Sequence, residues 1–502
     1  MAKVIMVQGT MSNVGKSLIT AGLLRVFMQD GYKVAPFKSQ NMALNSYITK
    51  DGLEIGRAQA MQAEACKIEP SVYMNPILLK PTSDIGSQVI VNGVPVGTMP
   101  AKEYFSYKTK LLPEIKSAYQ KLEEQYDIIV VEGAGSPAEI NLKENDIVNM
   151  GLAEFLDAPV LLVGDIDRGG VFAQLAGTLL LLEEKERERV KGLIINKFRG
   201  DKSILEPGLG MLEKIVKKPV IGVVPYGDMD IHDEDSLAER LSSKGKKGML
   251  NIRIVRLPRI SNFTDFYILE ATEGLQVQYV MQVSDLMDAD LIIIPGSKST
   301  IEDLLWLRSS GIEAAIKKKV ASGTAVIGIC GGYQIMGIEV EDLVGAESTK
   351  TVRGMELLPI RTEFQKEKTT KQVKGEICNN DGFFKELGGA TVQGYEIHMG
   401  ISRREGQALS KISARADTKE TLDGCIQGTC MGTYLHGIFD NKEFTDRLFR
   451  LLLKAKGYSG EELETPDMAE YKERQYNKLA QLIRENIDIK MVYGCMGMRH
   501  TI

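Results

Sequence analysis

The chain has 502 residues, of which 43% are hydrophobic and 26% are charged. This composition excludes a disordered or fibrous protein, and a length of about 150 residues per domain predicts two to four globular domains. Lys and Arg total 62 and Asp and Glu total 67, so the formal net charge is −5, which argues against a general nucleic-acid-binding protein.

The cysteines and the apolar segments indicate the compartment. Six cysteines are too few and too irregularly spaced for a disulfide framework, and none forms a C-x-x-C pair, so a reducing environment is expected. The apolar run at the N-terminus is too short for a signal peptide. The longest uncharged stretch, 320–338, contains five glycines and is not expected to span a membrane. We therefore expect a cytoplasmic protein with no membrane partner.

Short apolar runs recur along the first half of the chain. Runs at 3–8, 127–135 and 158–170 each lead into glycine, and runs at 190–198 and 218–227 continue the series. Segments of helical character, such as 17–30 and 104–125, lie between them. Short apolar runs bounded by glycine are typical of buried parallel strands, so residues 1–241 are predicted to form a doubly wound α/β domain with a parallel sheet.

The second half repeats this alternation after a break. Residues 242–250 are basic and rich in Ser and Gly, which is the composition of a linker. Residues 251–443 are predicted to form a second α/β domain, within which the charge run 365–374 is expected to be a solvated loop. Residues 444–502 are predicted to be a C-terminal helical segment that packs on the second domain.

A phosphate-binding loop is predicted where the first strand meets the first helix. In GTMSNVGKS (9–17), glycines let backbone N–H groups face a phosphate, Lys16 supplies positive charge, and the Ser17 hydroxyl can bind Mg²⁺. The P-loop spacing holds only if the count starts at Thr10, and the alternative is an ordinary turn between a strand and a helix. The ATP-binding residues predicted here are Gly9, Thr10, Asn13, Gly15, Lys16 and Ser17.

Phosphoryl transfer also requires carboxylates for the metal and a cation near the acceptor. Glu132, at the end of an apolar run and before Gly-Ala-Gly, is predicted to bind Mg²⁺ together with Ser17. Asp51 is a weaker metal candidate, as is Glu54, since a solvated turn explains both equally well. Lys38 is assigned to the ATP site, with a surface lysine as the alternative. Asn196 is assigned to adenine, with a turn asparagine as the alternative.

A second reactive site is predicted around Cys330. The run AVIGICGGY (325–333) has the G-x-C-x-G pattern of a nucleophile elbow, in which a strained turn exposes the thiol at a helix N-terminus. His436 is the predicted base, with His398 as runner-up, and the alternatives are an inert buried cysteine and structural histidines. The backbone N–H groups of Gly331 and of Gly296 or Ser297 are predicted to stabilise an oxyanion.

Several long runs together resemble the cobyric acid synthase family. They are VQGTMSNVGKS, PFKSQNMALNS, EIGRAQAMQAEA, YMNPILLKP, VVEGAGSPAEINL, GDIDRGGVFA, IIPGSKST, GICGGYQIMG, GYEIHMG and GTYLHGIFD. The resemblance covers nearly the whole chain. It implies a dethiobiotin synthetase-like P-loop domain joined to a class I-like glutamine amidotransferase domain.

The resemblance also implies an activity. The family uses ATP and Mg²⁺ to phosphorylate the b, d, e and g carboxylates of adenosylcobyrinic acid a,c-diamide, and ammonia released from glutamine then forms each amide. Cys330 matches the family's nucleophile and His436 its base. Class I amidotransferases carry Glu two residues after this His, where the chain has Ile438, so His436 is expected to work in a dyad or to be oriented by another group. Segments 40–46 and 57–64 are candidate corrinoid contacts.

Three rival functions are weighed at this point. CTP synthase shares the architecture, but its amidotransferase retains the Glu that Ile438 replaces. Cobyrinic acid a,c-diamide synthase shares both domains but amidates other carboxylates. A ParA/MinD-like ATPase switch is disfavoured, because such proteins place a signature Lys where this chain has Met11 and have no need of a Cys/His site. The sequence predicts no oligomeric state.

Overall fold

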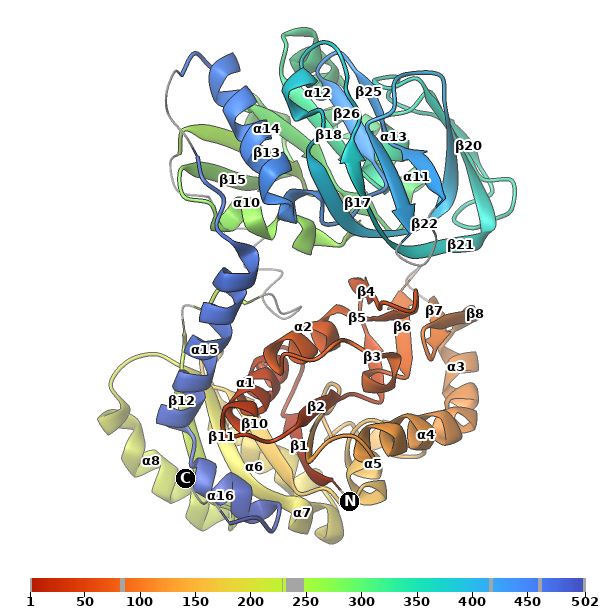
Figure 1. Ribbon diagram of the computed structural model, residues 1–502. Coiled ribbons are helices and arrows are strands. Elements are labelled where there is room, and N and C mark those ends of the chain that lie inside the picture. The colour runs from red at the N-terminus through yellow and green to blue at the C-terminus, as the bar shows by residue number, and fades with distance from the viewer. Residues whose placement is uncertain are drawn as a thin grey trace. The chain divides into compact units, whose positions relative to one another are not determined.

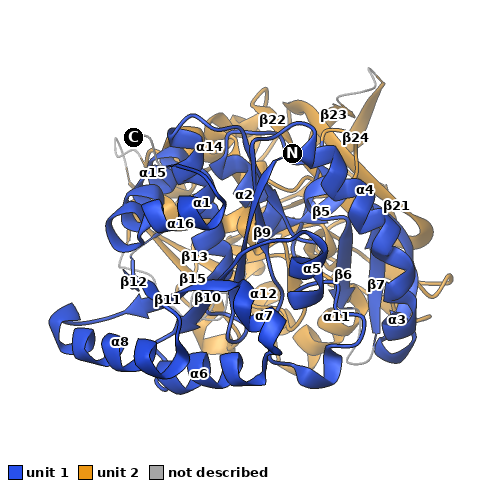
Figure 2. Cartoon of the chain, turned by 90° about the horizontal axis from the view of Figure 1, so that it is seen from below, with its two compact units in different colours: residues 1–49, 54–237, 471–502 blue, residues 50–53, 238–470 orange. Residues whose placement is uncertain are grey.

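The computed structural model describes residues 2–81, 86–227, 229–231, 248–414, 419–458 and 463–499. The chain divides into two compact units (Figure 2): residues 1–49, 54–237 and 471–502 form unit 1, and residues 50–53 and 238–470 form unit 2. Most of the predicted linker 242–250 lies outside the described residues. Within the described part of the chain, no helix has the length and apolar character needed to cross a bilayer.

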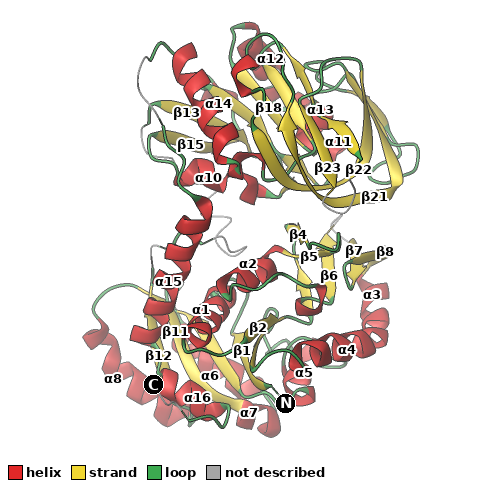
Figure 3. Ribbon diagram, in the orientation of Figure 1, coloured by secondary structure: helices red, strands yellow, loops and turns green. Residues whose placement is uncertain are grey.

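Unit 1 is built on a parallel sheet of six strands in the order β12-β11-β10-β1-β9-β2. Its strands are mostly buried apolar runs, which explains why they pair in parallel between helices (Figures 1 and 3). Their bounds are β1 Lys3–Gly9, β2 Val34–Phe37, β9 Ile128–Glu132, β10 Val160–Asp165, β11 Val190–Phe198 and β12 Val220–Pro225. The predicted parallel α/β architecture is confirmed.

The helices of unit 1 connect these strands. They are α1 Lys16–Gln29, α2 Arg57–Ala65, α3 Ala101–Tyr107, α4 Leu112–Glu123, α5 Met150–Phe155, α6 Val171–Leu181, α7 Glu184–Arg189 and α8 Lys202–Val216. The segment 104–125, predicted as one helix, is divided among α3, a short 3-10 turn and α4, with Pro113 in the first turn of α4.

Unit 1 also holds two small sheets that the sequence analysis did not predict. One has the order β3-β6-β7-β8, and the other is a hairpin of β4 and β5. Their bounds are β3 Gln40–Met42, β4 Ser46–Ile48, β5 Glu54–Gly56, β6 Ile77–Pro81, β7 Gly86–Val91 and β8 Val94–Pro100. Glu54, one of the weaker metal candidates, is buried here in an ion pair with Lys80, so its carboxylate is already compensated.

The C-terminal segment does not pack as predicted. Helix α14 (Lys442–Ala455) belongs to unit 2, but α15 (Met468–Asn486) from Tyr471 onward and α16 (Ile489–Cys495) belong to unit 1. One face of α15 joins the core around α1, and a Cβ added at Gly22 would lie only 2.4 Å from Ile483 Cγ1. The helical pattern identifies a face that must be buried, but not the partner that buries it.

This packing predicts a measurable loss of stability. Ile483 is fully buried against α1, so Ile483→Ala should lower the free energy of unfolding by about 2–5 kcal/mol in chemical denaturation. Lys478 on the same helix is exposed, and Lys478→Ala should change stability by no more than about 0.5 kcal/mol. Equal stability of the two variants would show that α15 is not part of the core.

Unit 2 has a second six-stranded sheet in the order β15-β13-β16-β18-β26-β25, in which only the β25–β26 pair is antiparallel. Its strands are β13 Leu250–Val255, β15 Leu275–Val280, β16 Leu291–Ile294, β18 Ala325–Ile329, β25 Cys425–Gln427 and β26 Cys430–Thr433. Its helices, besides α14, are α10 Tyr267–Ala271, α11 Thr300–Ser309, α12 Ile312–Ala321 and α13 Gly331–Ile335. This is the second predicted α/β fold.

A further sheet in unit 2 corrects one prediction. It has the order β20-β19-β21-β23-β24, with β22 beside β21, and its strands are β19 Glu339–Glu341, β20 Thr351–Arg353, β21 Ile360–Ile377, β22 Thr391–Arg404, β23 Ser410–Ala414 and β24 Glu420–Asp423. The charge run 365–374, predicted as a solvated loop, lies inside β21. Residues 369–374 of the run pair with β22, whereas residues 365–368 lie at a register shift in this pairing.

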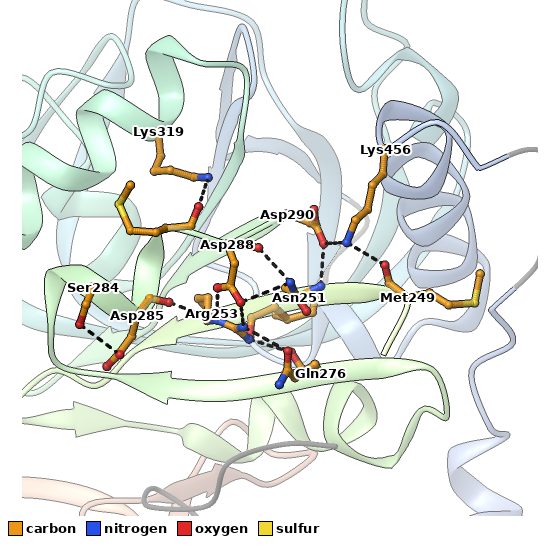
Figure 4. A network of polar contacts seen from close by, with 12 residues as sticks. Met249, Asn251, Arg253, Gln276, Ser284, Asp285, Asp288, Asp290, Lys319 and Lys456 are labelled. Carbon is orange, nitrogen blue, oxygen red and sulfur yellow. Dashed lines mark hydrogen bonds and ion pairs between the residues drawn. The ribbon is translucent and has the colours of Figure 1, made fainter. Parts of the chain in front are cut away.

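A buried arginine organises the amino ends of the strands in unit 2 (Figure 4). Arg253 Nη2 donates to Asp288 Oδ2 at 2.7 Å and its Nη1 to the Gln276 carbonyl at 3.1 Å. Lys456 at the end of α14 donates to Asp290 Oδ2 at 2.6 Å, and the same oxygen accepts the Asn251 N–H at 2.8 Å. These contacts connect β13, β15 and α14 at the edge opposite the strand ends that carry the predicted cysteine site.

Replacing Arg253 tests this network. Arg253→Met should cost about 1–3 kcal/mol of unfolding free energy, because carbonyl and carboxylate acceptors lose their donor. Lys319 nearby is half-buried, and its Nζ donates to the Met287 carbonyl at 3.0 Å (Figure 4). Lys319→Met should therefore leave the denaturation midpoint almost unchanged. A midpoint for Arg253→Met equal to that of the wild type would contradict a structural role for the network.

Candidate functional site

The phosphate loop joins β1 to α1 and is held by residues from β11. Gly15 has φ +91°, and a Cβ there would lie 2.3 Å from Asn196 Nδ2, so a side chain at this position would be both strained and blocked. Asn196 Nδ2 donates to the Val14 carbonyl at 2.8 Å, and Lys197 Nζ donates to the Asn13 carbonyl at 2.6 Å. The amide of Asn196, assigned to adenine from the sequence, thus supports the loop backbone.

Lys16 lies between the phosphate loop and the turn after β9. Its Nζ donates to the Met11 carbonyl at 2.9 Å and to the Gly135 carbonyl at 3.2 Å. The loop begins at Gly9, the last residue of β1, and the Thr10 N–H donates to the Val163 carbonyl of β10 at 2.9 Å. The predicted loop residues are therefore gathered at the carboxyl ends of neighbouring parallel strands, where α/β proteins bind ligands.

Glu132 is the centre of a buried polar cluster beside this loop. Its Oε1 accepts hydrogen bonds from Ser17 Oγ at 3.0 Å and from Lys38 Nζ at 2.7 Å. Its Oε2 accepts from Gln62 Nε2 at 2.5 Å. Burial by itself would raise the pKa of Glu132, but Lys38, Gln62 and Lys16 outweigh it and hold the pKa below its usual value. The carboxylate is therefore ionised at neutral pH.

This cluster fits a magnesium ion. Carboxylate and hydroxyl oxygens are ligands that Mg²⁺ prefers, and those of Glu132 and Ser17 are already adjacent. Gln62 Oε1 is a buried oxygen with no hydrogen-bond partner in the part of the chain that the structure describes. Asp51, by contrast, is exposed and groups with unit 2, so its place in the metal site stays a prediction.

The two candidate corrinoid segments are occupied largely by internal contacts. Asn41 Nδ2 donates to Gln59 Oε1 at 3.1 Å, and both side chains are buried. Gln62 points to Glu132, as described above, whereas Met42 is exposed. The amides of Asn41, Gln59 and Gln62 thus make contacts within unit 1.

Cys330 lies directly after β18, in the strained turn that the sequence predicts. Its φ is +51°, which is costly for a non-glycine residue and is found mainly at functional sites. A Cβ at Gly332 would lie 1.9 Å from the Ile294 carbonyl oxygen. The glycines after Cys330 therefore let α13 approach the end of β16 closely.

The predicted oxyanion donors lie together near Cys330. A Cβ at Gly331 would be 2.8 Å from Ser297 N, so the backbones of these two residues are adjacent. Ser297 Oγ donates to Asp303 Oδ2 at 2.6 Å and accepts the Ser299 N–H at 2.9 Å. Burial raises the pKa of Asp303 to about 6. Asp303 was not predicted from the sequence and fixes the turn that carries Ser297.

His436 follows β26 and is fully buried beside Cys330. Its Nδ1 lies 2.6 Å from Asp265 Oδ2, and the Tyr395 ring stacks on the imidazole at 5.2 Å between centroids. Burial would lower the pKa of His436, but the Asp265 carboxylate and the Cys330 sulfur raise it to about 10. The imidazolium form is thus favoured next to the sulfur, an arrangement that stabilises a thiolate.

His398, the runner-up base, has other contacts. Its Nδ1 lies 2.7 Å from the Gly400 carbonyl oxygen, and its ring stacks on Tyr434 at 3.8 Å. Burial lowers its pKa to about 4, so it is neutral at pH 7. Tyr434 in turn accepts a hydrogen bond from Gln334 Nε2 at 3.1 Å. His398 therefore belongs to a polar network beside the cysteine, and His436 is the histidine in contact with Cys330.

Two family models match the chain. A CobQ/CobB/MinD/ParA nucleotide binding domain matches residues 5–236, and a CobB/CobQ-like glutamine amidotransferase domain matches residues 251–444. Among solved structures, one described as "Crystal structure of glutamine amidotransferase" is 20% identical and covers 41% of this chain and 99% of its own, with a TM-score of 0.30.

Curated relatives match over nearly the full length. The cobyric acid synthase of Ruminiclostridium cellulolyticum is 55% identical over 98% of this chain and 97% of its own. That of Lachnoclostridium phytofermentans is 54% identical over 99% of both chains. The chain therefore belongs to the cobyric acid synthase family of glutamine-hydrolysing amide ligases.

Proposed function

We propose that this chain converts the b, d, e and g carboxylates of adenosylcobyrinic acid a,c-diamide to amides, with ATP as the activating substrate and glutamine as the nitrogen source. The observation that carries the proposal is the pairing, in one chain, of a Lys16–Ser17–Glu132 cluster with a Cys330–His436 pair. A carboxylate is a poor electrophile and must be activated before ammonia can replace its oxygen. The two sites supply these two requirements.

The activation step belongs to unit 1. A carboxylate oxygen of the corrinoid attacks the γ-phosphorus of ATP, the bond to ADP breaks, and an acyl phosphate forms. Lys16 and Lys38 offset negative charge on the phosphoryl group and on the incoming carboxylate. Ser17 and Glu132 would hold Mg²⁺, which when bound neutralises phosphate charge. Ammonia then attacks the acyl carbon and phosphate leaves with the C–O electron pair, which gives the amide.

The ammonia is released in unit 2. The Cys330 sulfur attacks the side-chain carbonyl of glutamine, and the N–H groups of Ser297 and Gly331 stabilise the oxyanion. His436 passes the thiol proton to the departing nitrogen, so ammonia leaves and a thioester remains. Water, deprotonated by His436, then cleaves the thioester to give glutamate and the free thiol.

A product assay tests the proposal. The enzyme is incubated with ATP, Mg²⁺, glutamine and, in separate reactions, cobyrinic acid or its a,c-diamide, and the products are identified by mass spectrometry. We expect acid-to-amide conversion of the diamide at b, d, e and g and no amidation of a or c. Amidation confined to a and c would instead assign the chain to the rival activity of cobyrinic acid a,c-diamide synthase.

A further inference from the structure

The histidine of the cysteine site needs a group that fixes its ring. In class I amidotransferases that group is a Glu two residues after the His, but this chain has Ile438 there, a buried apolar side chain. Without a partner at Nδ1, an imidazole is free to turn and to exchange tautomers, and proton transfer at Nε2 suffers. The orienting group must therefore come from another part of unit 2.

We propose that Asp265 is the positioning residue for His436. Both residues belong to unit 2, and Asp265 precedes His436 by 171 positions in the sequence. Asp265 lies in the 3-10 turn Phe263–Phe266, which follows β14 (Ile260–Ser261). Its Oδ2 lies 2.6 Å from His436 Nδ1, and its Oδ1 accepts the Gly437 N–H at 3.1 Å. One carboxylate thus holds both the ring and the backbone just beyond it.

Burial makes this contact strong and specific. Asp265 is 3% exposed and His436 is 0% exposed, so little water competes for the hydrogen bond between them. Because Nδ1–H is donated to Asp265, Nε2 is the nitrogen left to exchange a proton with Cys330. The carboxylate also stabilises the imidazolium that forms when His436 takes the thiol proton.

The faces of the ring are held as well. Tyr395 stacks on the imidazole with an interplanar angle of 17°. Asn262 Nδ2 lies 3.4 Å from Nδ1 and 3.3 Å from Nε2. A group so nearly equidistant from both nitrogens sits over the ring rather than in line with either lone pair. Asn262, just before the 3-10 turn, therefore contacts a face of the imidazole ring, and Asp265 within the turn contacts its Nδ1 edge.

The other buried carboxylates near this site have different partners. Asp423 accepts from the Thr433 hydroxyl and from the Tyr434 N–H, and Glu396 pairs with Lys371 at 2.7 Å. Asp303 holds Ser297, as described above. Asp265 is thus the carboxylate in the described part of unit 2 whose recorded contact is with the His436 ring.

The inference rests on the proposed glutamine hydrolysis at Cys330, and Asp265→Asn tests it. The amide is isosteric but carries no charge and offers a donor as readily as an acceptor, so the tautomer is no longer fixed. We expect kcat for glutamine hydrolysis to fall by about 10²–10⁴-fold, with KM for glutamine changed by no more than about threefold. Glu313→Gln, which removes another buried carboxylate of unit 2 that pairs with Arg308 and Lys317, is the matched control and should keep wild-type kcat.

The pH profile separates positioning from a purely structural role. In the described part of unit 2, the titratable groups beside His436 are Asp265, Cys330, the Tyr395 phenol that stacks on the ring and, at longer range, His398. Asp265 raises the pKa of His436 and so keeps the imidazole protonated to higher pH. Its removal should therefore move the alkaline limb of kcat/KM for glutamine to lower pH, a shift that Glu313→Gln should not produce.

The outcomes separate failure of the Asp265 role from failure of the proposed glutamine hydrolysis at Cys330. If Asp265→Asn hydrolyses glutamine within about threefold of the wild type, or loses activity with an unshifted pH profile, Asp265 does not position His436. If the wild type hydrolyses no glutamine, or Cys330→Ala hydrolyses it normally, the proposed function itself fails. Ammonia-dependent amidation, assigned to unit 1, should be equal in Asp265→Asn and the wild type.

Discussion

Cys330→Ala is expected to abolish amidation with glutamine and to leave amidation with ammonium salts at the wild-type rate. In the proposed mechanism the Cys330 thiol forms the thioester, and His436 and the oxyanion donors assist that step without replacing the sulfur. We expect glutamine-dependent turnover to fall by at least about 10³-fold. The measurement is amide formation on the corrinoid with each nitrogen source in turn.

Cys378→Ala is the matched control, because Cys378 is a half-buried cysteine of the same unit, directly after β21. It should retain both activities. Loss of ammonia-dependent amidation together with glutamine-dependent amidation in Cys330→Ala would contradict a role confined to ammonia release.

Lys16→Ala is expected to remove amidation with either nitrogen source. The ammonium group of Lys16 lies between the Met11 and Gly135 carbonyls at the predicted phosphate site, and an alanine leaves phosphoryl charge without this cation. Loss of one such preorganised electrostatic contact costs about 10²–10³-fold in kcat. The measurement is ADP release and amide formation at saturating ammonium.

Lys214→Ala, which removes an exposed lysine from α8 of the same unit, is the control and should behave as wild type. A Lys16→Ala enzyme that keeps ammonia-dependent turnover would show that carboxylate activation does not take place at the phosphate loop.

Local patterns predicted strands of the sheet in unit 1. The apolar run 127–135 contains β9 (Ile128–Glu132), whose residues are uniformly buried and lead into glycine. Hydrophobic patterns did not predict which unit buries the apolar face of a helix, because that depends on residues far away in the sequence. The apolar face of α15 indicates burial, but only the packing of Ile483 on Gly22 shows that unit 1 buries it.

In the candidate sites, too, residues in local motifs could be predicted from the sequence, whereas residues brought in by the fold could not. Cys330, His436, Lys16 and Ser17 lie in short motifs at strand ends, and the structure places each within its cluster. Asp265 is separated from His436 by 171 residues and belongs to no motif with a recognised chemistry, so nothing local marks it.

Two residues show the limits of sequence-based prediction at the phosphate-loop site: the contact of Gln62 was not predicted, and Asp51 was predicted as a metal ligand. Gln62 lies in a highly distinctive run, but a helix sequence does not reveal which neighbour its amide will reach, and the structure places it on Glu132. Asp51 has a suitable side chain, but it lies in an exposed turn and groups with unit 2, so its role at a metal site stays a prediction.

The central claim is that nitrogen released at Cys330 becomes the amide of a carboxylate activated at Lys16. It is tested most directly with glutamine labelled at the side-chain amide nitrogen, supplied with ATP, Mg²⁺, the a,c-diamide and unlabelled ammonium. We predict labelled amides at b, d, e and g with the wild type, only unlabelled amides with Cys330→Ala, and amide formation slowed by about 10²–10³-fold with Lys16→Ala. Labelled product from Cys330→Ala, or any amide from Lys16→Ala at the wild-type rate, would contradict the claim.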